Sequence, residues 1–400
     1  MEAVAGRARE PAGAKPVSEA PAPPSRGRMA GFLLTVAVIW ALAHFYIGVQ
    51  LVTALAPDAA WRAAGWAAIG VLWALPFAAF AAARRGDSRP RRAVAWAGYV
   101  ALGFSSVLVL FTVVANLVAA LARSRRGEWW LALGAVGGTV LVTLAGLLTA
   151  RTRRLVRVTV PIAALHPDLD GLRIVQISDL HLGHTLRRAF AEGVVTEVNG
   201  LDADLVAVTG DLADGHPRDL AALVAPFAAL RARHGTFFVT GNHEYFWDPA
   251  AWLRVIEGLG MTVLDGRHEV IRHGAARIVL AGVADGTVVP RALGPEAVLA
   301  AAPPGDLRVL LAHQPRDAYA AARAGFQLQL SGHTHGGQYF PFNLLVRLFQ
   351  PFVAGLHRTG GLWVYVSRGT GYWGPPLRFG APAEVTVMEL RRATALRAGA

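Results

Sequence analysis

Residues 172–181 read Leu-Arg-Ile-Val-Gln-Ile-Ser-Asp-Leu-His, and this stretch decides how the second half of the chain folds. Four of its first six residues are Leu, Ile or Val, which predicts a mostly buried strand over Leu172–Ile177. Two side chains able to bind metal, Asp179 and His181, follow at once. On an extended backbone, residues two apart point to the same side, so we expect both to reach one ion.

The same arrangement recurs four times further along the chain. Apolar runs are followed by Gly210-Asp211, by Gly241-Asn242-His243-Glu244, by His313 and by Gly332-His333-Thr334-His335. Gly210 permits a tight turn, which would let the Asp211 carboxylate bridge two ions. The chain contains no cysteine, so only His, Asp, Asn and Glu can supply protein ligands. The five segments together predict a site for a pair of divalent metals.

From about residue 155, strand-like and helix-like segments alternate, which predicts an α/β layer fold. The ligand segments follow strands, where open α/β sheets bind ligands. The expected strands are Leu172–Ile177, Leu205–Val208, Thr236–Val239, Arg277–Ala281, Leu307–Leu311, Phe326–Leu330, Leu362–Val366 and Glu384–Glu389. The expected helices are Arg187–Asn199, Leu220–Arg233, Pro249–Leu259 and Arg316–Ala324.

The first part of the chain has a different character. The whole chain is 54% hydrophobic and 16% charged, and the apolar excess lies largely before residue 150. Stretches at 30–54, 63–83, 93–121 and 130–150 are each long enough for a helix to cross a bilayer. Residues 1–28 are rich in Pro, Ala and Arg and are predicted to be a disordered tail. We therefore expect the tail at 1–28, a four-helix transmembrane region at 29–150 and a catalytic domain at 151–400.

Positive charge predicts the orientation of these helices. The net charge is +12, and many arginines flank the apolar stretches. Arg62 is the single basic residue of the first loop, whereas the second loop and the segment after the last span are strongly basic. This bias favours a multi-pass plasma-membrane protein with the catalytic domain in the cytoplasm. The charge would also suit nucleic-acid binding, but no recognition motif accompanies it, so we expect no nucleic-acid partner.

The five ligand segments, in this order, resemble the motifs of the calcineurin-like metallophosphoesterase superfamily. The resemblance covers residues 170–390, and Gly336-Gly337-Gln338 and Ser367–Gly371 are similar to a bacterial membrane-associated subgroup of phosphohydrolases. It implies a four-layer αββα sandwich, here preceded by the four-helix transmembrane region, and a metal-dependent phosphoesterase. Relatives that act on phospholipids or on UDP-diacylglucosamine imply a phosphodiester or pyrophosphate substrate, lipid-linked in some cases.

The resemblance also implies a role for each residue. One metal would be held by Asp179, His181, Asp211 and His335, and the second by Asp211, Asn242, His313 and His333, with Asp211 bridging. These ligands suit Mn, Fe or Zn. Two such ions about 3.5–4 Å apart would turn a bridging water into hydroxide that attacks phosphorus. His243 would face the phosphate and stabilise the transition state or protonate the leaving oxygen.

Other polar residues carry weaker expectations. We expect Glu244 to orient the imidazole of His243 or a metal ligand. Asp285 is expected to stabilise a turn, and Arg368 to contact either a substrate phosphate or an acidic partner. The remaining histidines of this half have no partners at ligand spacing and are expected to be solvated; they include His184, His216, His234, His268, His273 and His357.

A final segment, residues 340–352, places Leu345, Leu348, Phe349 and Phe352 at helical spacing. One interpretation is that this apolar stripe lies in the bilayer surface beside the metal site and admits a lipid tail. The alternative is a short helix packed on the domain's own sheet.

Two alternatives for the whole chain were a transport or sensing protein with an accessory hydrolase domain, and a non-catalytic binding module on the same fold. No charged residue lies inside the predicted spans and no expected ligand is missing, which favours the enzyme.

Overall fold

The computed structural model describes residues 26–122, 127–289 and 292–393. The predicted tail at 1–28 lies almost wholly outside these residues. Among the described residues, four helical segments are long and apolar enough to cross a membrane, at Ala30–Leu55, Ala59–Ala83, Arg89–Leu121 and Glu128–Thr149. The prediction of four long apolar helices in this region is therefore confirmed.

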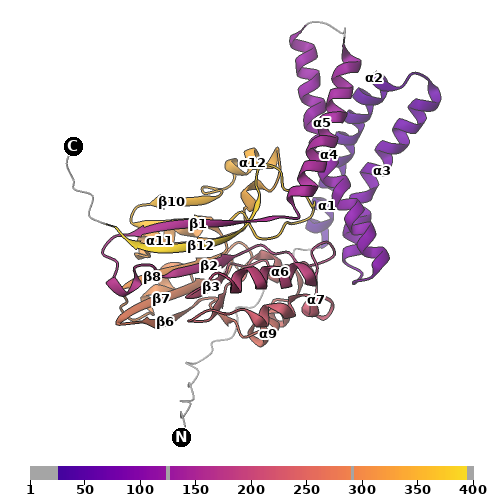
Figure 1. Cartoon of the computed structure of the whole chain (residues 1–400). Helices are drawn as coiled ribbons and strands as arrows, with labels where there is room; N and C mark the ends of the chain where they lie inside the picture. The colour runs from indigo at the N-terminus through magenta and orange to yellow at the C-terminus, as the bar shows by residue number, and fades with distance from the viewer. Residues whose placement is uncertain (1–25, 123–126, 290–291, 394–400) are drawn as a thin grey trace.

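The first span is assembled from three helical pieces. It begins as α1 (Arg26–Ile47), passes through a short π-helix at Gly48–Val52 and ends with α2 (Thr53–Leu55). The others are single helices, α3 (Ala59–Ala83), α4 (Arg89–Leu121) and α5 (Glu128–Thr149). They form a bundle that stands on one side of the α/β domain (Figure 1). Most of their outward side chains are apolar and exposed, as a lipid-facing surface requires.

The α/β domain contains two six-stranded sheets. The first has the order β1-β12-β2-β3-β4-β5 and the second β10-β11-β9-β8-β7-β6. In the first sheet β2, β3 and β4 run parallel, and in the second β7, β8, β9 and β11 do. The strand bounds are β1 Arg153–Ile162, β2 Arg173–Ile177, β3 Leu205–Val208, β4 Thr236–Phe238, β5 Thr262–Val263, β6 Arg267–His273, β7 Ala276–Val283, β8 Leu307–Ala312, β9 Leu328–Ser331, β10 Gly355–Thr359, β11 Leu362–Val366 and β12 Ala383–Arg392.

Three apolar cores separate four layers, which confirms the αββα architecture. One core lies between the two sheets, a second between the first sheet and its helices, and a third between the second sheet and its helices. The helices are α6 Arg188–Asn199, α7 Pro217–Val224, α8 Asn242–Trp247, α9 Pro249–Gly258, α10 Pro295–Ala300, α11 Ala318–Ala324 and α12 Phe342–Leu345.

The sequence analysis missed several elements at the margins of the sheets. Strands β1, β6 and β10 were not expected; all three are edge strands with exposed side chains, and β1 and β6 carry several charged residues. The helix expected over Leu220–Arg233 ends at Val224, because Pro226 follows and the chain continues as a 3₁₀ turn over Ala225–Ala229.

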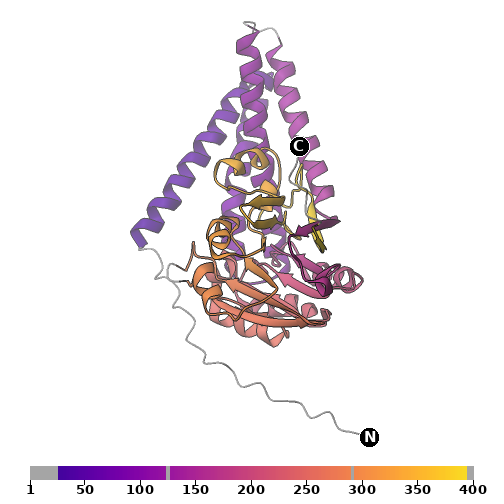
Figure 2. The ribbon, with the colours of Figure 1, turned by 90° about the vertical axis from the view of Figure 1, so that its left-hand side faces the viewer.

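The catalytic domain is docked directly against the membrane helices. Leu377, on the loop between β11 and β12, packs with Val107 of α4 and Tyr339 in one buried cluster. A Cβ added at Gly103 of α4 would lie 2.4 Å from Leu377 Cδ1 and 3.1 Å from Pro375 Cβ, so a larger residue here would displace the packed loop side chains. The Arg378 backbone N–H also donates to the Gly146 carbonyl of α5 at 3.0 Å. Figures 1 and 2 show this junction at the lower end of the bundle.

Candidate metal centre

The predicted ligands come from five loops that follow β2, β3, β4, β8 and β9. Because β2, β3 and β4 run parallel in one sheet and β8 and β9 run parallel in the other, their carboxyl ends meet at one edge of the sandwich. The structure brings all seven predicted ligand side chains to this edge, and most of them are buried. The seven residues are Asp179, His181, Asp211, Asn242, His313, His333 and His335.

The first set of donor atoms surrounds the imidazole of His335. His335 Nε2 lies 3.0 Å from His181 Nε2 and 3.5 Å from Asp179 Oδ1. His181 Nε2 in turn lies 3.7 Å from Asp211 Oδ2. The set proposed for the first metal therefore faces one small volume.

The second set shares Asp211 with the first. Asp211 Oδ2 lies 3.3 Å from His313 Nε2. Asn242 Oδ1 lies 3.2 Å from that same nitrogen and 3.1 Å from His333 Nδ1. One carboxylate oxygen thus approaches imidazoles of both sets, which is the geometry that a bridging ligand needs.

These separations test whether divalent metals fit. Two ligand atoms each about 2.1 Å from an ion, at 90–110° to one another, are about 3.0–3.4 Å apart. Four of the six observed separations, 3.0–3.3 Å, fall in this range, and the other two, 3.5 and 3.7 Å, are slightly longer. The donors are only carboxylate, amide and imidazole atoms, which suit Mn, Fe or Zn. The residues fit the ions that the sequence implied.

The backbone at the ligands differs from the expected extended conformation. Asp179, His181 and Asp211 have φ of 51°, 48° and 56°, and His333 and His335 also lie in the left-handed region. The argument from extended geometry at Asp179 and His181 was therefore wrong, although both side chains do face the same site. Non-glycine residues adopt this conformation at an energetic cost, and clustering of such residues is typical of functional sites.

Gly241 allows the loops to approach one another closely. A Cβ on this residue would lie 2.2 Å from Asp211 Oδ1 and 2.8 Å from His313 Cε1. The space next to the Asp211 carboxylate therefore requires glycine at this position.

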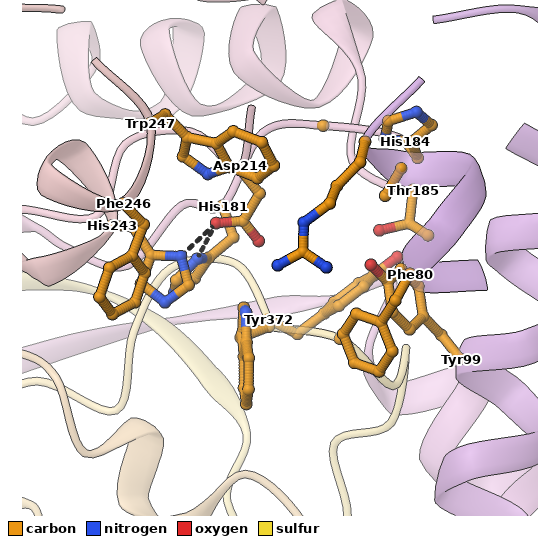
Figure 3. Close-up of a pocket in the computed structure, with 15 residues that line it drawn as sticks. Phe80, Tyr99, His181, His184, Thr185, Asp214, His243, Phe246, Trp247 and Tyr372 are labelled. Atoms are coloured by element: carbon orange, nitrogen blue, oxygen red, sulfur yellow. Dashed lines mark hydrogen bonds and ion pairs between the residues drawn. The ribbon is translucent and has the colours of Figure 1, made fainter. Parts of the chain in front are cut away.

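The sequence analysis missed Asp214, which joins two functional histidines. Its Oδ1 accepts hydrogen bonds from His181 Nδ1 at 2.9 Å and from His243 Nδ1 at 2.6 Å, as the dashed lines in Figure 3 show. The bond to Nδ1 leaves His181 Nε2 free to face the metal site. Asp214 follows Asp211 by three residues, and no spacing rule for metal ligands singles it out.

Charge decides the protonation of His243. Burial would lower its pKa, but the carboxylates of Asp211 and Asp214 outweigh burial and raise the pKa to about 9. His243 Nε2 lies 3.9 Å from Asp211 Oδ2, at the border of the proposed metal site. Burial would raise the pKa of Asp211, but the nearby His313 and His243 lower it well below its usual range. A protonated imidazole therefore lies beside an ionised carboxylate.

Glu244 stabilises the backbone of the loop that carries Asp211 rather than an imidazole. Its carboxylate accepts hydrogen bonds from the backbone N–H groups of Asp211 at 3.1 Å, Leu212 at 2.7 Å and Gly241 at 2.8 Å. Burial, together with the charge of Asp211, raises the pKa of Glu244 to about 7. The side chain fixes the turn that carries Asp211.

The structure also bears on the predicted roles of Asp285 and Arg368. Asp285 does stabilise a turn, through Thr287, but its carboxylate also lies within 4.8 Å of donor atoms of His313 and His333. Arg368 forms an ion pair of 2.8 Å with Glu384, so the interpretation as a structural pair is correct.

Four of the histidines expected to be solvated make hydrogen bonds: His184, His234, His273 and His357, the last with the Ala354 carbonyl at 3.0 Å. His184 Nε2 contacts the Gly86 carbonyl, and the His184 side chain lines a cavity beside the candidate metal centre. His234 and His273 form a hydrogen-bonded pair at 2.9 Å, away from the metal ligands.

A cavity of about 220 Å³ opens beside His181, Asp214 and His243. Its walls are strongly aromatic, and Figure 3 shows Phe246, Trp247 and Tyr372 around the three polar side chains. A phosphoester bound here would lie against the edge of the candidate metal centre.

Comparison with known proteins agrees with this site. A family model described as calcineurin-like phosphoesterase matches residues 172–337. A "Transmembrane protein with metallophosphoesterase domain" from Bos taurus is 39% identical over 275 residues, which cover 65% of this chain and 62% of that protein. Its counterpart in Danio rerio is 36% identical over 321 residues, covering 74% and 72%. An uncharacterised metallophosphoesterase of Helicobacter pylori strain J99 is 38% identical over 224 residues, covering 55% and 60%.

Proposed function

This chain belongs to the calcineurin-like phosphoesterase family, and from that premise we propose that it is a membrane-anchored phosphohydrolase that uses two divalent metal ions. The observation that carries the proposal is the spacing of the donor atoms around Asp211 Oδ2, with His181 on one side and His313 on the other. We assign residues 29–150 to the membrane region and 151–400 to the catalytic domain.

The proposed first metal is held by Asp179, His181, Asp211 and His335, and the second by Asp211, Asn242, His313 and His333. When bound, the two ions would supply an activated water for attack on phosphorus and would neutralise the phosphoryl oxygens.

The protein's own residues position the site and transfer the proton. Asp179 accepts the His333 backbone N–H at 2.9 Å, and Asp211 accepts the His243 backbone N–H at 2.9 Å, which fixes both carboxylates. The carboxylates of Asp211 and Asp214 outweigh burial and raise the pKa of His243, which favours its protonated form. His243 is therefore suited to donate a proton to the leaving oxygen, with Asp214 holding the ring in place.

The surface next to the site supports a lipid-linked phosphodiester or pyrophosphate as substrate. The segment at 340–352 does not form the continuous helix expected from its spacing, because α12 ends at Leu345 and a 3₁₀ turn follows. Leu348 and Phe349 are 75% and 74% exposed, whereas Phe352 packs against the core of the second sheet. Apolar side chains this exposed favour contact with a bilayer. Helix α12 lies on the side of the domain that faces the membrane helices (Figure 1).

Activity of the purified full-length protein tests the proposal. We expect hydrolysis of phosphodiesters or lipid pyrophosphates in the presence of Mn²⁺, and loss of this activity in Asp211→Asn. Comparable turnover by Asp211→Asn would show that Asp211 is not the bridging ligand. A wild-type protein that binds Mn²⁺ but hydrolyses none of the substrates would instead support a binding module.

Replacing both Leu348 and Phe349 with Ser tests the membrane contact. We expect activity on a lipid substrate in vesicles to fall, while activity on a small soluble diester is retained. Equal effects on the two substrates would contradict the proposed contact.

A further inference from the structure

The membrane helices form one wall of the catalytic cavity. Phe80 and Arg84 from the end of α3 and Tyr99 from α4 line it, opposite His181 and His243. Figure 3 shows Phe80 and Tyr99 facing the metal-site residues across the cavity. Asp214 and Arg84 are both close enough to interact electrostatically with the Tyr99 hydroxyl. A molecule whose phosphorus lies at the metals would therefore touch residues of the membrane region.

The turn between α3 and α4 is fixed to the catalytic domain. Asp87 forms an ion pair of 2.7 Å with Arg187, which precedes α6, and a second of 3.2 Å with Arg92 of α4. The Gly86 carbonyl contacts His184 Nε2 at 3.4 Å. These contacts hold the end of α3 at the mouth of the cavity.

Arg84 is the cation of this wall, and among the described residues no carboxylate is paired with it. Its guanidinium makes no ion pair and no side-chain hydrogen bond with any residue that the structure describes, whereas Arg92 and Arg187 nearby are both paired with Asp87. A guanidinium presents a planar set of donors that matches the oxygens of a phosphate or carboxylate. An unpaired arginine that lines a catalytic cavity is thus suited to bind an anionic group of the substrate.

The rest of the surroundings suits an amphiphilic molecule. A second cavity of about 340 Å³ shares Thr185 and Tyr372 with the catalytic cavity, and membrane-helix residues Trp96 and Leu147 line it. Apolar parts of a substrate could leave the metal site along this aromatic surface toward the lipid-facing helices. The Arg84 guanidinium and an adjoining apolar surface thus lie along the same route from the metal site to the membrane helices.

We propose that Arg84 binds a second anionic group of the substrate, beyond the phosphorus that is attacked, so that the membrane region takes part in substrate selection. This inference rests on the proposed phosphohydrolase function and deepens it. The substrate class that fits is a lipid carrying two linked phosphates, with one phosphate at the metals, the other at Arg84 and the chain directed to the membrane. Arg84 is a specificity-determining residue in this scheme and takes no part in the chemical step.

Steady-state kinetics of the full-length protein in detergent with Mn²⁺ tests the inference. The substrates are a polyprenyl pyrophosphate, which carries two phosphates, and bis(p-nitrophenyl) phosphate, which carries one. We expect Arg84→Ala to raise KM for the pyrophosphate about 10- to 100-fold, as loss of a hydrogen-bonded charge pair predicts. Hydrolysis of the small diester should stay within about twofold, which also shows that the variant is folded.

Two further variants make the comparison sharper. Arg85→Ala removes the next arginine, which does not line the cavity, and should leave both substrates unaffected. Arg84→Lys keeps the charge and should recover part of the affinity for the pyrophosphate.

The inference fails if Arg84→Ala leaves KM for the pyrophosphate unchanged, if it affects both substrates equally, or if the wild-type protein hydrolyses only the small diester. In each of these cases the proposed phosphohydrolase function stands, because Asp211→Asn tests that function independently with the small diester. If the wild type hydrolyses neither substrate, both proposals fall.

Discussion

Asp214→Asn is the substitution that tests most directly how the candidate centre works. In the wild type, one oxygen of Asp214 accepts hydrogen bonds from His181 and His243. The substitution keeps the shape of the side chain but removes its charge. A carboxylate that orients a metal-binding histidine typically contributes 10- to 100-fold to metal affinity or activity, which corresponds to about 1.4–2.7 kcal/mol. We expect Mn²⁺ affinity to fall by a factor in this range, because His181 is no longer held by a charged acceptor.

The same substitution should also change the dependence of activity on pH. The pKa of His243 is raised to about 9 with Asp211 and Asp214 nearby, so its imidazole is protonated below that pH and loses its proton above it. If His243 donates the proton to the leaving oxygen, wild-type kcat falls as the pH rises through the pKa of His243. Removing the charge of Asp214 lowers this pKa, and the fall in kcat should move to lower pH.

Calorimetric titration with Mn²⁺ and a pH profile of kcat measure the two effects separately. Asp204→Asn is a matched control: its carboxylate accepts a hydrogen bond from the Arg173 backbone N–H at 2.9 Å, at the opposite end of the strands from the ligands. The control should change neither quantity. Unchanged Mn²⁺ affinity together with an unchanged pH profile in Asp214→Asn would refute the role assigned to this carboxylate.

Three other predictions concern the bridging loop, the domain junction and the orientation. Glu244→Gln places an amide against backbone N–H donors and should lower the free energy of unfolding by about 1–3 kcal/mol, measured by chemical denaturation; an unchanged stability would contradict its structural role. Gly103→Val should loosen the contact between the catalytic domain and α4, because the new Cβ would lie 2.4 Å from the Leu377 side chain. We expect faster proteolysis between the two regions; proteolysis at the wild-type rate would argue against the packing. The chain has no cysteine, so single introduced cysteines can report its orientation in the membrane. If the catalytic domain is in the cytoplasm, Asp58→Cys should react with a membrane-impermeant maleimide on intact cells, whereas Glu269→Cys should react only after lysis. The reverse pattern would overturn the orientation.

The membrane helices and the inner strands were predictable because their signal is local. About 20 consecutive apolar residues are enough to specify a span, whatever the rest of the chain does. Strands such as β3 and β8 are buried on both faces and are therefore almost wholly apolar. Edge strands β1 and β6 could not be found this way, since part of each strand remains exposed and their charged residues mask the apolar pattern.

The sequence by itself determined the chemical types of the candidate ligands, their order and their position after strands, because a metal accepts few side-chain types and parallel strands bring such segments to one edge. Only the tertiary structure decided the left-handed backbone at Asp179 and His181, the link through Asp214 and the position of Arg84 at the cavity. Each of these depends on which groups meet across distant segments. Two long apolar helices and four strands separate Arg84 from His243 along the chain, and no local pattern predicts that both line one cavity once the helices dock on the α/β domain.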